Sequence, residues 1–191
     1  MNKIILLLLV TIGLSGCIAP QSFLEPKYRG VTYQDIKAPA TPIPVQLTVV
    51  GQTNGALNDR ATEYWRRQVE RVLSASRFFD PNQAATGAKL NITINNIGDR
   101  GSAAGKGFVT GLTFGAVGSL VTDGYIMTVE YRDSSGRVMT KTYQHAIYTA
   151  IGNATPPPGI SPVTLAEAPA LVAEDMLLHF LKDLNTATTT P

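Results

Sequence analysis

The chain of 191 residues contains one cysteine and two histidines. The single cysteine, Cys17, excludes an intrachain disulfide and any metal site built from several cysteines. His145 and His179 share no metal-ligand spacing with each other or with Cys17. We therefore expect both histidines to be structural, and we predict no metal site.

Motifs for phosphate binding and nucleophilic catalysis are also missing. Residues 101–106 resemble a Walker A loop only superficially, because three residues separate Gly101 from Gly105 where the motif needs four. Gly107 then stands where the motif needs a Ser or Thr after Lys106. No Gly-x-Ser-x-Gly elbow occurs. The sequence predicts a protein that is not an enzyme and binds no cofactor.

Charge is sparse and nearly balanced. The chain has 16 Lys and Arg against 14 Asp and Glu, a formal net charge of +2. This balance provides no basic surface for nucleic acid, so we predict no nucleic-acid partner. Charged residues make up 16% of the chain, and glycine is common, with 17 residues. Such a composition is typical of a protein that lies beside a membrane or a partner.

The N-terminus has the parts of a secretory signal. Lys3 precedes an apolar stretch over residues 4–12, which is well short of the roughly 20 residues that span a bilayer. The small residues of Leu14-Ser15-Gly16-Cys17 follow. An ordinary secretory signal with an incidental cysteine and a short membrane anchor are the alternative interpretations.

The segment Leu14-Ser15-Gly16-Cys17 resembles the lipobox of bacterial lipoproteins. The resemblance implies that residues 1–16 are a signal peptide, cut between Gly16 and Cys17. It also implies that the thiol of Cys17 receives a diacylglycerol and the new amino group a third acyl chain, which removes this thiol from catalysis. In that family an Asp at the next position retains the protein in the inner membrane. Ile18 stands there, so we expect the periplasmic face of the outer membrane, with the inner membrane as the alternative.

Residues 17–42 contain several prolines, which fix φ and remove backbone donors. We predict that this segment is a lipid-anchored tether, semi-extended and dispensable for the stability of the domain. The alternative is that residues 28–33, which carry Tyr28 and Tyr33, dock on the domain.

Periodic segments predict one α+β domain over residues 43–185, with a mainly antiparallel sheet and two helices packed on one face. Alternating apolar residues predict strands, and an apolar stripe at helical spacing predicts each helix. Asn58 and Asp59 are placed to cap the first helix, and Pro169 lies near the first turn of the second or breaks off a short leading helix. Residues 186–191 are predicted to be a disordered tail. The expected strands lie at 45–52, 90–97, 125–132 and 138–150, and the second helix within 162–185.

A glycine-rich insert at residues 101–124 interrupts the domain, with no charge between Lys106 and Asp123. Glycines spaced four residues apart on one helical face allow close approach of backbones, so this face is a candidate for membrane contact or self-association. The alternative is a glycine-rich hairpin or buried turn, because each glycine costs helix stability by up to about 1 kcal/mol. The glycines of the candidate face are Gly107, Gly111 and Gly115, continued by Gly118.

The order of these features resembles the complement-resistance and surface-exclusion lipoproteins of conjugative plasmids. The resemblance rests on the lipobox, a small α+β domain and the insert, followed by Asp123-Gly-Tyr-Ile-Met-Thr-Val-Glu130. It implies a lipoprotein that oligomerises at the outer membrane. We expect a non-enzymatic envelope lipoprotein that scaffolds, oligomerises or assists envelope assembly, with the membrane, further copies or an envelope protein as partners. The alternative is a ligand- or lipid-binding auxiliary lipoprotein of an envelope transport system.

Overall fold

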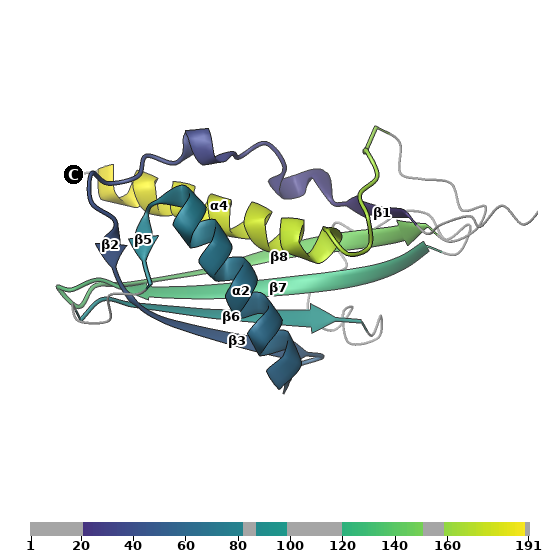
Figure 1. Cartoon of the computed structure of the whole chain (residues 1–191), viewed down its shortest axis with the longest axis horizontal. Coiled ribbons are helices and arrows are strands. Elements are labelled where there is room, and N and C mark those ends of the chain that lie inside the picture. The colour runs from purple at the N-terminus through teal and green to yellow at the C-terminus, as the bar shows by residue number, and fades with distance from the viewer. Residues whose placement is uncertain (1–20, 82–86, 99–119, 151–158, 190–191) are drawn as a thin grey trace, which may run out of the picture.

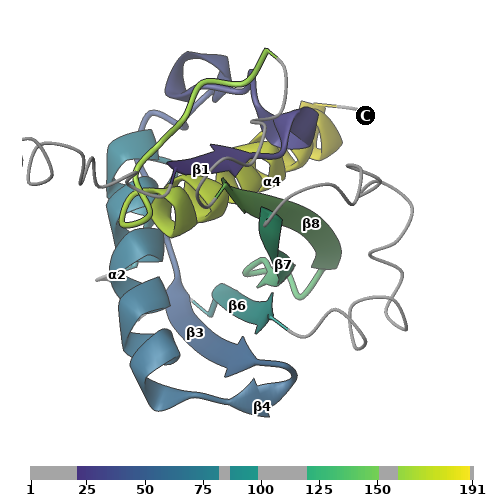
Figure 2. The same cartoon turned by 90° about the vertical axis from the view of Figure 1, so that its right-hand side faces the viewer.

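The structure is a computed structural model that describes residues 21–81, 87–98, 120–150 and 159–189. Its main element is a six-stranded sheet with the strand order β1-β8-β7-β6-β3-β4 (Figures 1 and 2). Neighbouring strands are antiparallel except β3 and β6, which run parallel. The strands are β1 (Gln21–Leu24), β3 (Gln46–Thr53), β4 (Ala56–Leu57), β6 (Lys89–Ile97), β7 (Leu120–Arg132) and β8 (Val138–Ala150).

Two helices, α2 (Asp59–Ser76) and α4 (Ala168–Thr189), pack on one face of this sheet (Figure 1). The predicted α+β class, with a mainly antiparallel sheet covered by two helices on one face, is confirmed. A small parallel pair, β2 (Ile43–Pro44) and β5 (Phe79–Asp80), lies beside the sheet, and two 3-10 helices, η1 (Pro26–Tyr28) and η2 (Tyr33–Asp35), precede it in the chain. Within the described segments, no helix is both long and apolar enough to cross a membrane.

Helix α2 begins where the sequence predicts. The side chain of Asn58 accepts a hydrogen bond from the backbone N–H of Ala61 at 3.1 Å and so satisfies one of the free donors of the first turn. The helix ends at Ser76, and the next residue, Arg77, caps it with a left-handed φ of 54°. Its apolar face is buried against the sheet at Trp65, Val69, Val72 and Leu73.

Close contact between β3 and α2 depends on Gly51. A Cβ at this position would lie 2.4 Å from the backbone N of Thr62, a distance that real Cβ atoms do not show. The N–H of Gly51 donates to Thr62 Oγ1 at 2.8 Å, and Asn58 N–H donates to the carbonyl of Gly51 at 3.0 Å. The first turn of α2 is therefore fastened directly to the strand before it.

The core lies between the sheet and the two helices. Alternate residues of β6 and β7 point into it, as the pattern of the sequence predicts. The apolar stripe of α4 covers the same face. The buried residues include Leu90, Ile92 and Ile94 from β6, Met127 and Val129 from β7, and Met176, Leu177, Phe180 and Leu181 from α4.

The described part of the expected tether, residues 21–42, is not a free leash. β1 pairs with the end of β8, from Gln21 opposite Ala150 to Leu24 opposite Ile147. Phe23 is 1% exposed and Leu24 is fully buried. The tether prediction is wrong for these residues, and the alternative of docking describes them. Proline prevents a central strand, but it allows a short edge strand and a 3-10 turn, which Pro26 begins here.

The expected disordered tail also differs from the structure. Helix α4 continues through Thr189, four residues beyond the predicted boundary at Asn185. The amide of Asn185 bonds both backbone groups of Lys37, accepting from its N–H at 3.0 Å and donating to its carbonyl at 2.9 Å. The N-terminal segment and the last turns of α4 therefore hold each other in place.

Candidate functional site

The sequence-predicted site residues lie outside the described residues, but the strands beside them locate their neighbourhood. Gln21 of β1 and Leu120 of β7 both pair with Ala150 of β8. We call this line of residues the Gln21 row. It lies at the end of the sheet that faces the viewer in Figure 2. The predicted site residues in question are Gly16, Cys17, Gly107, Gly111, Gly115 and Gly118.

The Gln21 row brings together segments that are distant in the sequence. Cys17 precedes Gln21 by four residues, so the chain between them spans at most about 14 Å. Residues 99–119 join the end of β6 to the start of β7, and Ile97 pairs with Gly124, four residues after Leu120. Gln21, Ile97 and Leu120, described residues that precede or follow these segments in the chain, thus lie near one end of the sheet.

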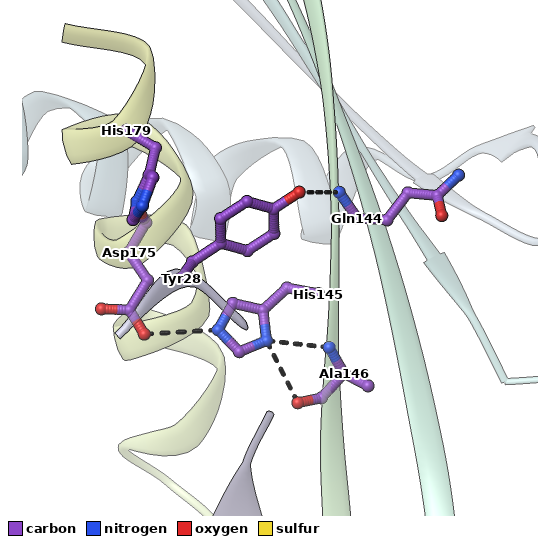
Figure 3. Close-up of polar contacts among 6 residues, drawn as sticks. All are labelled: Tyr28, Gln144, His145, Ala146, Asp175 and His179. Atoms are coloured by element: carbon purple, nitrogen blue, oxygen red, sulfur yellow. Dashed lines mark hydrogen bonds and ion pairs between the residues drawn. The ribbon is translucent and has the colours of Figure 1, made fainter. Parts of the chain in front are cut away.

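A buried polar cluster lies farther along β8 (Figure 3). His145 is fully buried, and its Nε2 lies 3.3 Å from Oδ2 of Asp175 on α4. Its Nδ1 accepts the backbone N–H of Ala146 at 2.8 Å. Nδ1 also lies 3.2 Å from the carbonyl oxygen of Ala146, and Nε2 faces a carboxylate oxygen, which can only accept, so a proton on Nε2 is donated to Asp175.

Tyr28 from η1 closes this cluster from the N-terminal side (Figure 3). Its ring centroid lies 4.9 Å from that of His179 and 5.7 Å from that of His145, and it meets Tyr143 edge-on at 5.9 Å. Its hydroxyl accepts the backbone N–H of Gln144 at 3.3 Å. The cluster therefore joins η1, β8 and α4, which lie far apart in the chain.

Two further carboxylates lie at the margin of the cluster. Burial raises the pKa of Glu25, and the nearby charges of His145 and Lys27 act in the opposite direction. The hydroxyl of Tyr143 donates to Oδ2 of Asp183 at 2.8 Å. Burial, followed by this bond to Asp183, raises the pKa of Tyr143 above its usual value. The ionisable groups around Tyr28 are thus engaged with one another.

This arrangement fastens three segments of the chain together, η1, β8 and α4. The fully buried imidazole of His145 is enclosed by protein on all sides. Across the described ranges, no group of three or more His, Cys, Asp or Glu side chains is placed to hold a metal ion. What the cluster does is fix the N-terminal segment onto β8 and α4.

A shallow groove lies at the opposite end of the sheet from the Gln21 row, between the β7–β8 hairpin and the last turns of α4. Its volume is about 490 Å³. Lys141 Nζ from β8 lies 3.7 Å from Oδ2 of Asp183 on α4, so an ion pair spans part of it. The lining is mixed, with apolar Val138, Met139 and Leu184 beside charged Asp133, Arg137 and Lys141.

Sequence reasoning missed the Tyr28–His145 cluster. The contact between Tyr28 and His145 spans more than 100 residues, and no local spacing indicates it. The only signal was the docking alternative for residues 28–33, which did not name a partner. No protein-family model matches the chain, and no curated protein matches it significantly.

Proposed function

We propose that the chain is a bacterial envelope lipoprotein, anchored through lipid on Cys17 at the periplasmic face of the outer membrane. The observation that carries the proposal is the segment Leu14-Ser15-Gly16-Cys17, followed within four residues by a strand of the folded domain. Each buried CH₂ contributes about 0.8 kcal/mol to membrane binding, and two acyl chains already give stable attachment. Three chains on Cys17 would hold the protein permanently.

We propose a non-enzymatic role, as a scaffold or assembly factor of the envelope. The short connection between Cys17 and Gln21 supports this role, because Gln21 begins β1, which is part of the sheet and pairs with β8. A domain attached in this way stays at the membrane surface with one end toward the lipid. A long leash would let the domain explore a much larger volume.

The glycine-rich insert belongs to the same proposal. The described ends of its flanking strands, Ile97 of β6 and Leu120 of β7, lie near the Gln21 row, which is the membrane-proximal end in this proposal. We propose that Gly107, Gly111, Gly115 and Gly118 contact the membrane or another copy. Replacing Gly111 and Gly115 by Leu separates the two, because packing between copies fails while binding to liposomes holds or rises.

The second candidate function is that of a ligand-binding auxiliary lipoprotein of an envelope transport system. The groove of about 490 Å³ beside the β7–β8 hairpin favours it. A lipid or small apolar ligand requires a predominantly apolar lining. The charged residues Asp133, Arg137 and Lys141 in this lining make the groove a weaker support than the N-terminal motif.

The anchoring proposal is tested by intact mass and membrane fractionation. The wild-type protein should carry the mass of its acyl chains, and Cys17→Ser should leave an unlipidated precursor that retains residues 1–16. Ile18→Asp is the matched control, since it should keep the acyl mass and move the protein to the inner membrane. A mature wild-type protein without acyl chains would end the proposal.

The scaffolding role is tested by chemical crosslinking in intact envelopes. Lipidated wild-type protein should be captured with further copies or with an envelope protein, and Cys17→Ser should lose these products. A monomeric wild-type protein that co-purifies with a small apolar molecule would favour the second candidate function instead.

A further inference from the structure

Among the described residues, neighbouring strands cover both edges of the six-stranded sheet only in part. At one edge, β1 pairs with residues 147–150 of β8, and no other strand of the described segments pairs with the earlier part of β8 on this side. At the other edge, β4 pairs with Gln52 and Thr53 of β3, and no described strand pairs with residues 46–50 on the outer side. We call residues 138–142 the open β8 edge and residues 46–50 the open β3 edge. Figure 2 shows β3 and β8 toward opposite sides of the sheet.

At alternate residues of the open β3 edge, the backbone N–H and C=O groups point outward, away from β6. Gln46 N–H donates toward the β6 side, to the carbonyl of Ala88 at 2.9 Å. Gly51 bonds on the outer side, to the first turn of α2. The odd-numbered residues Leu47 and Val49 therefore direct their N–H and C=O groups outward. Throughout the described chain, no residue pairs with these outward groups.

The open β8 edge has the complementary arrangement. Gln144 N–H points away from β7 and donates to the hydroxyl of Tyr28. By the two-residue period of a strand, Val138, Thr140 and Thr142 point their backbone groups to the same outer side. Nothing in the described segments pairs with the outward groups of Thr140 and Thr142, and both side chains are exposed.

The two open edges lie at the same level along the strands of the sheet. One row of paired residues crosses the sheet from edge to edge through Gln46, Lys89, Arg132 and Val138. A parallel row joins Val50 to Thr142 in the same way. The open edges are therefore the same length of strand at the same level, on opposite sides of the molecule.

The open β3 edge and the open β8 edge also run in the same direction, and residues opposite each other in the row lie on the same face of the sheet. β3 runs parallel to β6, and β6 and β8 are both antiparallel to β7, so β3 and β8 point the same way. In this row register Leu47 stands opposite Met139, and both lie on the helix-covered face of the sheet. Thr48 stands opposite Thr140, and both lie on the other face.

Neither open edge carries the usual protection against strand addition. Charged side chains, prolines and bulges normally block such edges. Residues 46–50 contain no charge and no proline, and residues 138–142 contain one charge, Lys141. That ammonium group lies 3.7 Å from Asp183 on α4, so it is directed toward the helix rather than across the edge.

We propose that the open β3 edge of one copy pairs with the open β8 edge of the next copy, as parallel strands in the row register. Leu47 and Val49 then exchange backbone hydrogen bonds with Val138, Thr140 and Thr142 of the next copy. Leu47 enters the groove beside Met139 and Leu184 of that copy. A head-to-tail contact of this kind repeats from copy to copy and closes into a ring when the rotation allows it.

The choice of a second copy rests partly on the proposed lipid anchor. Copies anchored in one membrane must all direct their Gln21 rows toward it. Parallel pairing preserves the strand direction and satisfies this condition. A two-fold pairing of β8 with β8 of another copy is antiparallel, and it would direct the two Gln21 rows to opposite sides.

Engineered cysteines test this pairing in the full-length lipoprotein in its own membrane, because Cys17 is the only natural cysteine. Thr48→Cys and Thr140→Cys combined in one chain should give a ladder of disulfide-linked multimers on mild oxidation. Either single variant alone should give none. The matched control combines Thr48→Cys with Thr142→Cys, which lies two residues out of register and beyond the Cα separation of about 7 Å that a disulfide bridges.

Several results would overturn the inference. One is a dimer from Thr140→Cys alone, which indicates two-fold pairing of β8, and another is capture of a different protein by either single variant. A lipidated protein that gives no ladder would overturn the pairing and leave the lipid anchor standing. A ladder from a protein without acyl mass would overturn the anchor and leave the pairing standing.

A proline variant gives a second test that does not depend on disulfide geometry. Thr140→Pro removes an outward N–H while leaving the bonds between β7 and β8 intact. The variant should melt cooperatively, and it should run as a monomer in detergent where the wild type and Thr140→Ser run as oligomers. A folded Thr140→Pro variant that keeps the wild-type oligomer size would contradict the pairing.

Discussion

His145 on β8, which is fully buried, pairs with Asp175 on α4, whose side chain is 18% exposed, and Nε2 of the imidazole lies 3.3 Å from Oδ2 of the carboxylate. The imidazole of this pair lies beside the ring of Tyr28, which belongs to the N-terminal segment, with 5.7 Å between the ring centroids (Figure 3). A polar group with no contact to water depends entirely on its partner inside the protein. The pair therefore couples the sheet, the last helix and the N-terminal segment.

Removing the carboxylate of this pair should destabilise the domain. Asp175→Ala leaves the Nε2–H of buried His145 without its acceptor, which costs about 1–3 kcal/mol. Asp175→Asn keeps an acceptor and should cost less. The measurement is urea-induced unfolding. As a control, Glu63→Ala removes one half of an exposed ion pair with Arg67 and should cost less than about 1 kcal/mol. Equal losses for Asp175→Ala and Glu63→Ala would contradict the role of the pair.

The N-terminal segment should contribute to stability as a part of the core. Leu24 of β1 is fully buried, so Leu24→Ala should lower the free energy of unfolding by about 2–5 kcal/mol. The matched control is Leu57→Ala on β4, where the leucine is 75% exposed and the loss should be small. Thermal unfolding compares the two variants. Similar melting temperatures for both would mean that β1 is not part of the cooperative unit.

Gly51 should tolerate no side chain. In Gly51→Ala the new methyl group would meet backbone atoms of Ala61 and Thr62 in α2, so the helix or the strand must shift. The expected cost is about 1–3 kcal/mol or more. Gly98→Ala is the control, since its nearest neighbours would lie at 3.8 Å or beyond, an ordinary contact. If circular dichroism melts show equal stability for the two variants, the close approach of β3 and α2 is not required.

The β7–β8 turn should respond to acid through Asp133. Its carboxylate accepts bonds from the hydroxyl of Ser135 and from Arg137, which hold its pKa at about 2, below the ordinary value of 3.8. The folded state therefore binds fewer protons than the unfolded state between these values. The stability that Asp133 contributes is present above pH 3.8 and is lost as the pH falls to about 2.

Thermal unfolding of the wild type and Asp133→Asn over this pH range tests the dependence. The variant should be less stable above pH 3.8, and the difference should shrink toward pH 2. Ser135→Ala should give a smaller difference with the same trend, since it removes one of the donors to Asp133. A difference between wild type and Asp133→Asn that does not change with pH would contradict this assignment.

Local patterns in the sequence were sufficient to predict the central elements. The alternation of Leu90, Ile92 and Ile94 identifies β6 because one face of that strand is buried and the other is not. Asn58 identifies the start of α2 because its side chain bonds to the first turn of the same helix. Each of these signals operates within a few residues.

The N-terminal segment and the buried cluster could not be predicted in this way. The burial of Leu24 depends on its pairing with Ile147, more than 120 residues later in the chain. The prolines of residues 21–42 restrict the local backbone conformation, but they do not indicate where this segment docks. His145 and Asp175 meet only because β8 and α4 are packed together. Cys17, the best-supported site residue of the sequence, lies outside the described residues.

The pairing of β1 with β8 also determines how the domain would bear mechanical load. The hydrogen bonds between antiparallel strands lie perpendicular to the strands. A pull on Gln21 away from the sheet, along the axis of β1, therefore loads all the bonds of β1 at once, in shear. The bonds cannot open one after another, as they would in peeling. Tension arriving from the side of Cys17 would be shared across this edge and passed directly to β8.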